Sequence, residues 1–140
     1  MKPNVGDPKK TIRRLVLIDD DSTDNFLHSR LLRRSGIVEN LVVFEEAEAA
    51  LEYICASTEP VDMICLDINM PRMNGFEFLD AFESSWDPRL DKPIVVILST
   101  SVGPAEMDYA KRIPRVVGAE TKPLSPELIE FLAERYFFSE

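Results

Sequence analysis

The clearest indication of how this chain folds is the segment Leu15-Val16-Leu17-Ile18-Asp19-Asp20-Asp21. Four apolar residues run directly into three acids, and the pattern returns where Met63-Ile64-Cys65-Leu66 runs into Asp67. Apolar runs this short, bounded by turn-prone residues, are typical of buried strands. If the two strands are parallel neighbours, their carboxylates emerge at one edge of the sheet, where open α/β sheets bind ligands.

The acids at this edge point to a bound cation. Asp19, Asp20 and Asp67 would repel one another at such close spacing unless a positive charge lay among them. Mg²⁺ takes oxygen ligands and brings substrate phosphates with it. The pattern therefore indicates phosphoryl chemistry, with Mg²⁺ as the expected cofactor.

Length and composition bound the class of protein. The 140 residues, 45% of them hydrophobic and 29% charged, fit one globular domain. A net charge of -9 argues against a nucleic-acid partner, because such affinity comes mainly from Lys and Arg on phosphates. No apolar run approaches membrane-spanning length, and the first ten residues do not resemble a secretory signal. We therefore expect a cytoplasmic protein that contacts neither nucleic acid nor membrane.

The two cysteines support this expectation. Cys55 and Cys65 lack metal-ligand spacing, and each falls in an apolar context. Buried free thiols are a more frequent use of such residues than a disulfide.

Strand and helix patterns alternate five times along the chain. We expect strands over 13–18, 41–44, 61–66, 94–98 and 116–117, and helices over 24–35 and 46–56 and from about 76, 104 and 126. Regular alternation predicts a parallel sheet with helices on both faces, because parallel strands need crossover connections. We therefore expect an α/β, doubly wound five-stranded parallel sheet over residues 12–140, preceded by a flexible leader over residues 1–11.

The first helix carries several specific expectations. Its apolar residues recur at helical spacing and should face the core: Phe26, Leu27, Leu31 and Leu32. Ser22 or Thr23 is the expected N-cap, whereas Asp21 and Asp24 should face solvent or cap the helix. His28 is expected at the surface or partly packed.

Two further polar residues follow predicted strands. Ser99 follows the fourth strand and Lys122 the fifth, so both would lie at the same rim as Asp67. An aspartate can attack phosphorus to form an acyl phosphate. Such transfer is assisted by a cation, an ammonium and a hydroxyl donor. Asp67 is the best-placed nucleophile, and Mg²⁺, Lys122 and Ser99 would supply these three groups.

At this point the sequence resembles the receiver domain of bacterial two-component response regulators, a CheY-like domain, over about residues 13–138. The matching motifs are Ile18-Asp19-Asp20-Asp21, Leu66-Asp67-Ile68-Asn69-Met70-Pro71 continuing to Gly75, Leu98-Ser99-Thr100, and Thr121-Lys122-Pro123-Leu124. The resemblance implies a flavodoxin-like sheet with strand order 2-1-3-4-5.

The resemblance also implies a phosphoacceptor and its metal ligands. Asp67 would accept a phosphoryl group from a histidine kinase or a histidine phosphotransfer protein. Asp19 and Asp20 would hold Mg²⁺ together with Asp67 and the backbone carbonyl of Asn69.

The remaining motifs imply a hydroxyl and a lysine that contact the phosphoryl group. Ser99 would be the switch hydroxyl, with Thr100 as the alternative if the strand ends one residue later. Lys122 would pair with the phosphoryl group, and the Lys122–Pro123 peptide bond would be cis.

One position departs from the pattern. Ala119 stands where family members often carry the aromatic residue that turns inward when the hydroxyl moves, so the output surface need not be the usual one. Asn69 and Ser101 occupy the positions that tune the lifetime of the phosphoryl group in this family.

The aromatic residues near the C-terminus cannot all face the core: Phe131, Tyr136, Phe137 and Phe138. We therefore expect that the last two helices and the fifth strand form a surface for docking or homodimerisation.

Three functions follow from these residues. The leading one is a stand-alone receiver, a monomer or weak homodimer, which signals through an unidentified protein. We expect that it is not an enzyme, apart from catalysing its own phosphorylation and autodephosphorylation. A phosphatase of the haloacid-dehalogenase type is the first alternative, but such enzymes use a second acid where this chain has Asn69. The second alternative is an interaction module that signals without phosphorylation, which typically loses one or more of the residues retained here.

Overall fold

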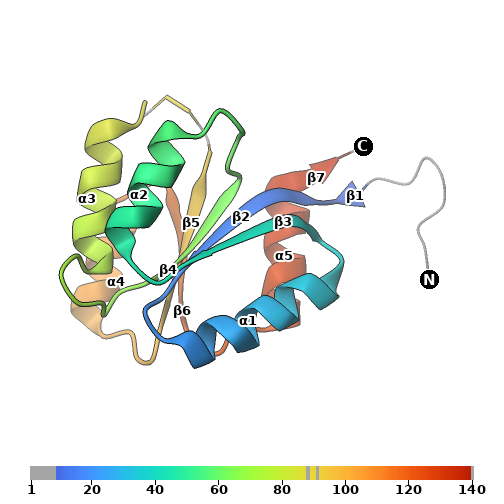
Figure 1. Cartoon of the computed structure of the whole chain (residues 1–140). Helices are drawn as coiled ribbons and strands as arrows, with labels where there is room; N and C mark the ends of the chain where they lie inside the picture. The colour runs from blue at the N-terminus through green and yellow to red at the C-terminus, as the bar shows by residue number, and fades with distance from the viewer. Residues whose placement is uncertain (1–8, 88, 91, 140) are drawn as a thin grey trace.

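Five parallel strands form the central sheet of the computed structural model, which describes residues 9–87, 89–90 and 92–139 (Figure 1). They are β2 (Ile12–Ile18), β3 (Val38–Phe44), β4 (Met63–Asp67), β5 (Ile94–Ser99) and β6 (Val116–Thr121). Their order across the sheet is β3-β2-β4-β5-β6. The predicted order 2-1-3-4-5 is therefore confirmed, because β2 is the first strand of this sheet.

A second, two-stranded sheet joins the ends of the described chain. β1 (Lys9–Lys10) pairs antiparallel with β7 (Phe138–Ser139). Of the expected leader over residues 1–11, residues 1–8 lie outside the described residues.

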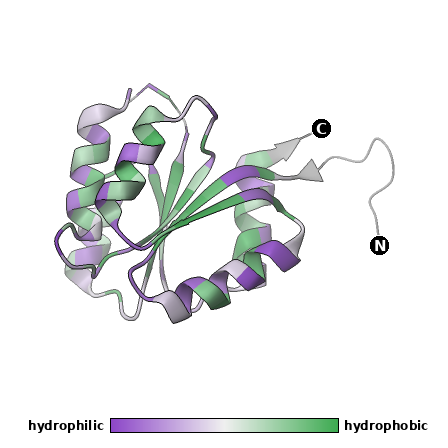
Figure 2. Cartoon of the chain, viewed as in Figure 1, coloured by the Kyte–Doolittle hydropathy of each residue, from purple (hydrophilic) through white to green (hydrophobic). Residues whose placement is uncertain are grey.

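Helices cover both faces of the central sheet. α1 (Ser22–Ser35) and α5 (Pro126–Phe137) contribute to the hydrophobic cluster on one face. α2 (Ala47–Ala56), α3 (Gly75–Ser85) and α4 (Pro104–Lys111) contribute to the cluster on the other face. The strands between the two layers are hydrophobic along most of their length (Figure 2). Alternate residues of one strand serve opposite clusters, as Val16 and Leu17 do in β2, which explains the continuous apolar runs.

Two expectations for α1 were wrong. The N-cap is not Ser22 or Thr23 but Asp21, whose side chain accepts the backbone N–H of Asp24 at 3.0 Å. The expectation that Asp21 faces solvent or caps the helix is thereby confirmed. Phe26 and Leu27, which were expected to face the core, are instead 63% and 55% exposed.

Polar residues take part of the buried face of α1 instead. Asn25, His28 and Ser29 are buried, so the expectation that His28 lies at the surface or is partly packed was wrong. The reason is that this side of α1 faces polar backbone: the Asn25 amide donates to the carbonyl of Asp19 at 2.7 Å.

The two thiols differ in burial. Cys65 is buried in β4, as expected, whereas Cys55 is exposed on α2. The core-facing positions of α2 are taken by Ala47, Ala50 and Ile54, which leaves Cys55 pointing outward. Among the described residues, no helix has the length and apolar character needed to cross a membrane.

Candidate functional site

Three aspartates meet at the carboxyl end of the sheet. Asp19 and Asp20 follow β2, and Asp67 is the last residue of β4. β2 and β4 are parallel neighbours with Ile18 opposite Leu66, so the residues that follow emerge side by side. One carboxylate oxygen from each aspartate lies within 4.8 Å of the others. Asp19 and Asp67 are buried, whereas Asp20 is exposed. Three carboxylates at this spacing form a donor set that fits a hard divalent cation such as Mg²⁺.

Lys122 supplies the positive charge at the buried side of the cluster. It lies directly after β6, and its ammonium Nζ is 2.7 Å from Asp19 Oδ2 and 3.5 Å from Asp67 Oδ1. Burial works toward a lower pKa of Lys122, but its hydrogen bonds to Asp19 and Asp24 outweigh that effect and raise the pKa. Lys122 therefore remains an ammonium at neutral pH.

The environment of Asp67 disfavours its charge. Burial is the largest cause, and the negative charge of Asp19 adds to it; together they raise the pKa of Asp67 from an ordinary value of 3.8 to about 6. Lys122 opposes the shift, and Asp20 adds a smaller increase. Asp67 is thus a carboxylate at neutral pH that is destabilised until a cation approaches it.

Ser99 supplies a buried hydroxyl at the end of β5, the strand that pairs with β4. It is the last residue of β5, where Leu98 pairs with Asp67 of β4. Its side chain is 0% exposed, and its Oγ has no hydrogen-bond partner among the described residues. Thr100, one residue later, is exposed. A buried hydroxyl without a partner is poised to bond a group that is added to the site.

The backbone next to Lys122 is linked directly to β5. The N–H of Lys122 donates to the carbonyl of Ser99 at 2.7 Å, and the Lys122–Pro123 peptide bond is cis. The hydrogen bond between Lys122 and Ser99 holds the ends of β5 and β6 together, where their polar residues emerge.

The loop after β4 is fitted closely to the site. Asn69 is exposed, and the N–H of Gly75 donates to the carbonyl of Ile68 at 2.8 Å. A Cβ on Gly75 would lie 2.7 Å from the backbone oxygen of Asp67. A glycine at this position therefore allows α3 to begin against the end of β4.

The two remaining predicted positions are in the segment before α4 and within β6. Ser101 is exposed in the segment before α4. Ala119 is half-buried in β6 and lines a hollow of about 210 Å³ between α4 and β6.

Asp24 is a site residue that the sequence did not reveal. Its Oδ2 lies 2.8 Å from Nζ of Lys122, although the two residues are 98 positions apart. Near it, His28 accepts the N–H of Leu124 through Nε2 at 3.2 Å. Asp24 and His28 are four residues apart, so they lie on the same face of α1. This spacing alone does not predict that both residues contact the loop between β6 and α5.

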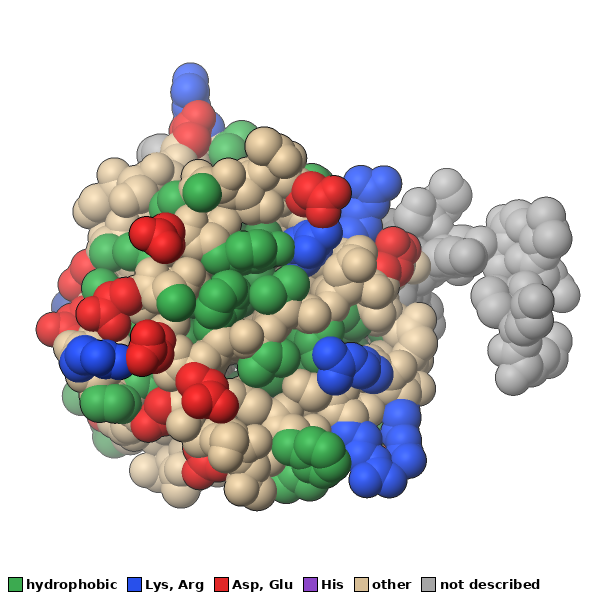
Figure 3. All heavy atoms as spheres, viewed as in Figure 1, with side chains coloured by type: hydrophobic (Ala, Val, Ile, Leu, Met, Phe, Trp, Pro, Cys, Tyr) green, Lys and Arg blue, Asp and Glu red, His purple; other side chains and the backbone are tan. Residues whose placement is uncertain are grey.

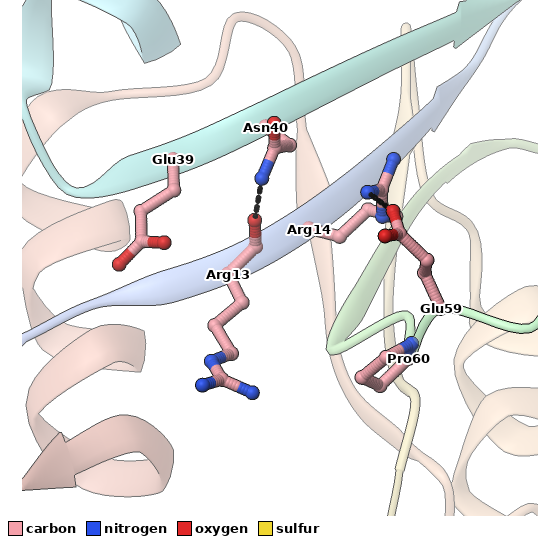
Figure 4. A pocket seen from close by; sticks show the side chains of 6 residues that line it. All are labelled: Arg13, Arg14, Glu39, Asn40, Glu59 and Pro60. Carbon is pink, nitrogen blue, oxygen red and sulfur yellow. Dashed lines mark hydrogen bonds and ion pairs between the residues drawn. The ribbon is translucent and has the colours of Figure 1, made fainter.

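A second polar hollow lies at the opposite end of the sheet, where the strands begin. It measures about 210 Å³, and Figure 4 shows the residues that line it: Arg13, Arg14, Glu39, Asn40, Glu59 and Pro60. Arg14 is ion-paired with Glu59, and the Asn40 amide donates to the carbonyl of Arg13 at 3.1 Å. This hollow mixes two arginines with two glutamates and lacks the concentrated charge of the three aspartates, so the acid cluster is the stronger candidate site.

Comparisons with known proteins agree with this geometry. The family model of the response regulator receiver domain matches residues 15–130. The two-component response regulator ORR6 of Oryza sativa subsp. japonica is 32% identical over 136 residues, which cover 93% of this chain and 74% of that protein. Protein-glutamate methylesterase/protein-glutamine glutaminase 3 of Burkholderia thailandensis is 35% identical over 102 residues, which cover 73% of this chain but 26% of that protein.

A solved structure extends the likeness to the whole fold. The two component response regulator from Cytophaga hutchinsonii superposes with a TM-score of 0.82 at 32% sequence identity, covering 90% of this chain and 97% of that one. The matched family model and these relatives show that the chain belongs to the response regulator receiver domain family.

Proposed function

We propose that residues 12–140 form a receiver that takes a phosphoryl group onto Asp67 from a phosphorylated histidine of a kinase or phosphotransfer protein. The observation that carries the proposal is the position of Asp67. It is buried beside two further acids and 3.5 Å from the Lys122 ammonium. This environment combines a carboxylate nucleophile with groups that stabilise negative charge.

In the proposed step, a carboxylate oxygen of Asp67 attacks phosphorus. The new O–P bond forms as the P–N bond to the donor histidine breaks, and the histidine nitrogen keeps the electron pair. A bound Mg²⁺, held by Asp19, Asp20, Asp67 and the backbone carbonyl of Asn69, would neutralise charge on the phosphoryl oxygens.

Two side chains would contact the new phosphoryl group. Lys122 donates from its ammonium, which already faces Asp67. Ser99 supplies the hydroxyl, in preference to Thr100, because its buried Oγ has no partner among the residues described. Moving the Ser99 hydroxyl toward the phosphoryl oxygen would shift the segment that leads into α4, and Ser101 lies in that segment.

We further propose that phosphorylation changes the affinity of this chain for a second protein. Phe131 on α5 is 59% exposed, and Ala119 leaves a hollow next to α4, so the surface of α4, β6 and α5 offers apolar area for a partner or a second copy. Light scattering on the phosphorylated and unphosphorylated protein separates a monomer from a weak homodimer. A cytoplasmic location fits the free thiols Cys55 and Cys65.

The decisive experiment is incubation with acetyl phosphate and Mg²⁺ followed by intact-mass measurement. We expect the wild type to gain one phosphoryl group and Asp67→Asn to gain none. Asp108→Asn, which removes an exposed acid of α4, is the matched control and should gain the group like the wild type.

Two outcomes would contradict the proposal. Equal labelling of Asp67→Asn would mean that another residue is the acceptor. Continuous release of phosphate from a small ester, well beyond one equivalent, would favour a phosphatase.

A further inference from the structure

Lys122 is held by a carboxylate that lies outside the acid cluster. Its ammonium donates to Asp19 at 2.7 Å and to Asp24 at 2.8 Å, and both contacts are shorter than the 3.5 Å to Asp67. An ammonium has three donors, so two are taken by Asp19 and Asp24, and the third is left for the side of Asp67. The Lys122 side chain is 12% exposed, which limits the water available to replace either bond.

The two carboxylates differ in what else they can do. Asp19 belongs to the group of acids whose oxygens lie within 4.8 Å of one another, so a bound cation would compete with Lys122 for it. Asp24 does not belong to that group. A cation bound by the acid cluster would therefore not compete with Lys122 for Asp24.

α1 also fixes the backbone that carries Lys122, through a different residue. His28 is 4% exposed and lies one turn after Asp24, and its Nε2 accepts the N–H of Leu124 at 3.2 Å. Leu124 is two residues after Lys122, so this bond restrains the loop independently of Asp24. Loss of the Asp24 carboxylate would remove one of the two short hydrogen bonds of the lysine side chain without releasing the loop.

We propose that Asp24 is a positioning residue, which holds the Lys122 ammonium beside Asp67 so that its third donor meets a phosphoryl oxygen. The inference rests on the proposed phosphorylation of Asp67. A lysine side chain has four rotatable bonds and loses considerable rotamer freedom when it is fixed. Because the hydrogen bond to Asp24 already fixes the lysine side chain, little further rotamer entropy is lost when the phosphoryl group is added. This is the general advantage of a preorganised site.

The first test measures the Lys122 ammonium by ¹⁵N NMR on the protein without metal or phosphoryl analogue. In the wild type, its protons should exchange slowly with water. In Asp24→Ala they should exchange about tenfold faster, whereas the backbone N–H of Leu124 keeps its protection because His28 is untouched. This readout does not depend on whether Asp67 is phosphorylated.

The second test measures the affinity of beryllium fluoride, an analogue of the phosphoryl group, at saturating Mg²⁺. We expect Asp24→Ala to bind about tenfold more weakly than the wild type, which is the loss of one charge-assisted hydrogen bond. Asp24→Asn should fall between them, because its amide oxygen can still accept a hydrogen bond from Lys122.

Charge alone predicts the opposite order. Removing a negative charge near an anion site favours the anion, so Asp24→Ala and Asp24→Asn would then bind equally, and more tightly than the wild type. Asp21→Asn is the matched control, since it removes a charge from the same turn of α1, retains a good N-cap and has no bond to Lys122. It should bind at least as tightly as the wild type.

An unchanged Lys122 ammonium signal in Asp24→Ala overturns the inference, as does an affinity equal to or above that of the wild type. Failure of the wild type itself to bind beryllium fluoride refutes the proposed function instead.

Discussion

The free energy of unfolding is lower when Asp67 is charged than when it is protonated. Its pKa is raised from 3.8 to about 6, so the native state binds this proton more tightly than the unfolded chain does. The group therefore opposes folding above about pH 6, and this effect disappears as the pH falls from about 6 to about 4.

We predict that Asp67→Asn stabilises the protein in the absence of divalent cations. At about pH 8 the gain in the free energy of unfolding should approach, as an upper limit, roughly 3 kcal/mol, because one pKa unit corresponds to about 1.4 kcal/mol. The gain should shrink toward zero at about pH 4. Urea denaturation with a chelator present at both pH values measures it, and Asp108→Asn serves as the control. A variant less stable than the wild type at about pH 8 would contradict this electrostatic interpretation.

The sequence predicted residues that follow a strand better than residues that lie within a helix. Asp19, Asp20, Asp67 and Lys122 were identified because strand ends in a parallel sheet converge at one edge. The contact between Asp24 and Lys122 was not predictable, since a helical surface acid is compatible with solvent and with many partners. Its role depends on where a loop 98 positions away lies.

α3 begins in contact with the end of β4, and a single glycine permits this. A Cβ on Gly75 would lie 2.7 Å from the oxygen of Asp67 and 2.8 Å from Cα of Ile68. Both are backbone atoms, which cannot move aside as a flexible side chain can. We predict that Gly75→Ala destabilises the protein by about 1–3 kcal/mol, the usual range for overpacking, and displaces Asp67.

Gly118 provides the matched control for this substitution. A Cβ there would have its nearest contact at 3.5 Å, with the flexible side chain of Glu120. Gly118→Ala should therefore change the urea midpoint little, whereas Gly75→Ala should lower it and slow labelling by acetyl phosphate. Equal effects of the two substitutions would mean that the close approach at Gly75 is unimportant.

The extents of the elements were harder to predict than their order. β3 begins at Val38, three residues before the expected Leu41, because Glu39 and Asn40 are exposed in this edge strand and hide it from an apolar pattern. β6 continues through Gly118 and Ala119 to Thr121, although glycine and alanine have low strand propensity. In both cases pairing with the neighbouring strand decides the conformation rather than local preference.

α1 shows the same limit for side-chain burial. Phe26 and Leu27 have the helical spacing of a core-facing pair, yet both are exposed on a helix that also carries exposed Arg30, Arg33 and Arg34. Figure 3 shows basic side chains gathered along the lower right of the molecule, where α1 lies in the same view. Periodicity indicated the helix correctly, but the sheet and the β6–α5 loop determine which face is buried.

The fold as a whole brings distant charges together. Asp19 and Lys122 are 103 positions apart, and Asp67 comes from a third strand. Folding must therefore gather three carboxylates into one partly buried site beside the Lys122 ammonium. A cation bound only by the folded arrangement would reduce this repulsion, and its binding energy would add to the stability of the entire domain.

We predict that Mg²⁺ raises the free energy of unfolding of the wild type by about 2.7 kcal/mol at a concentration one hundred times its dissociation constant. Thermal denaturation over a range of MgCl₂ concentrations measures this gain, with NaCl of equal ionic strength as the control for screening. In Asp20→Asn the gain should be much smaller at the same Mg²⁺ concentrations, because an exposed ligand is lost while the buried Asp19–Lys122 pair remains. In Asp24→Asn the gain should be largely retained, because Asp24 lies outside the cluster. Equal stabilisation of the wild type and Asp20→Asn would show that Mg²⁺ acts elsewhere on this acidic protein.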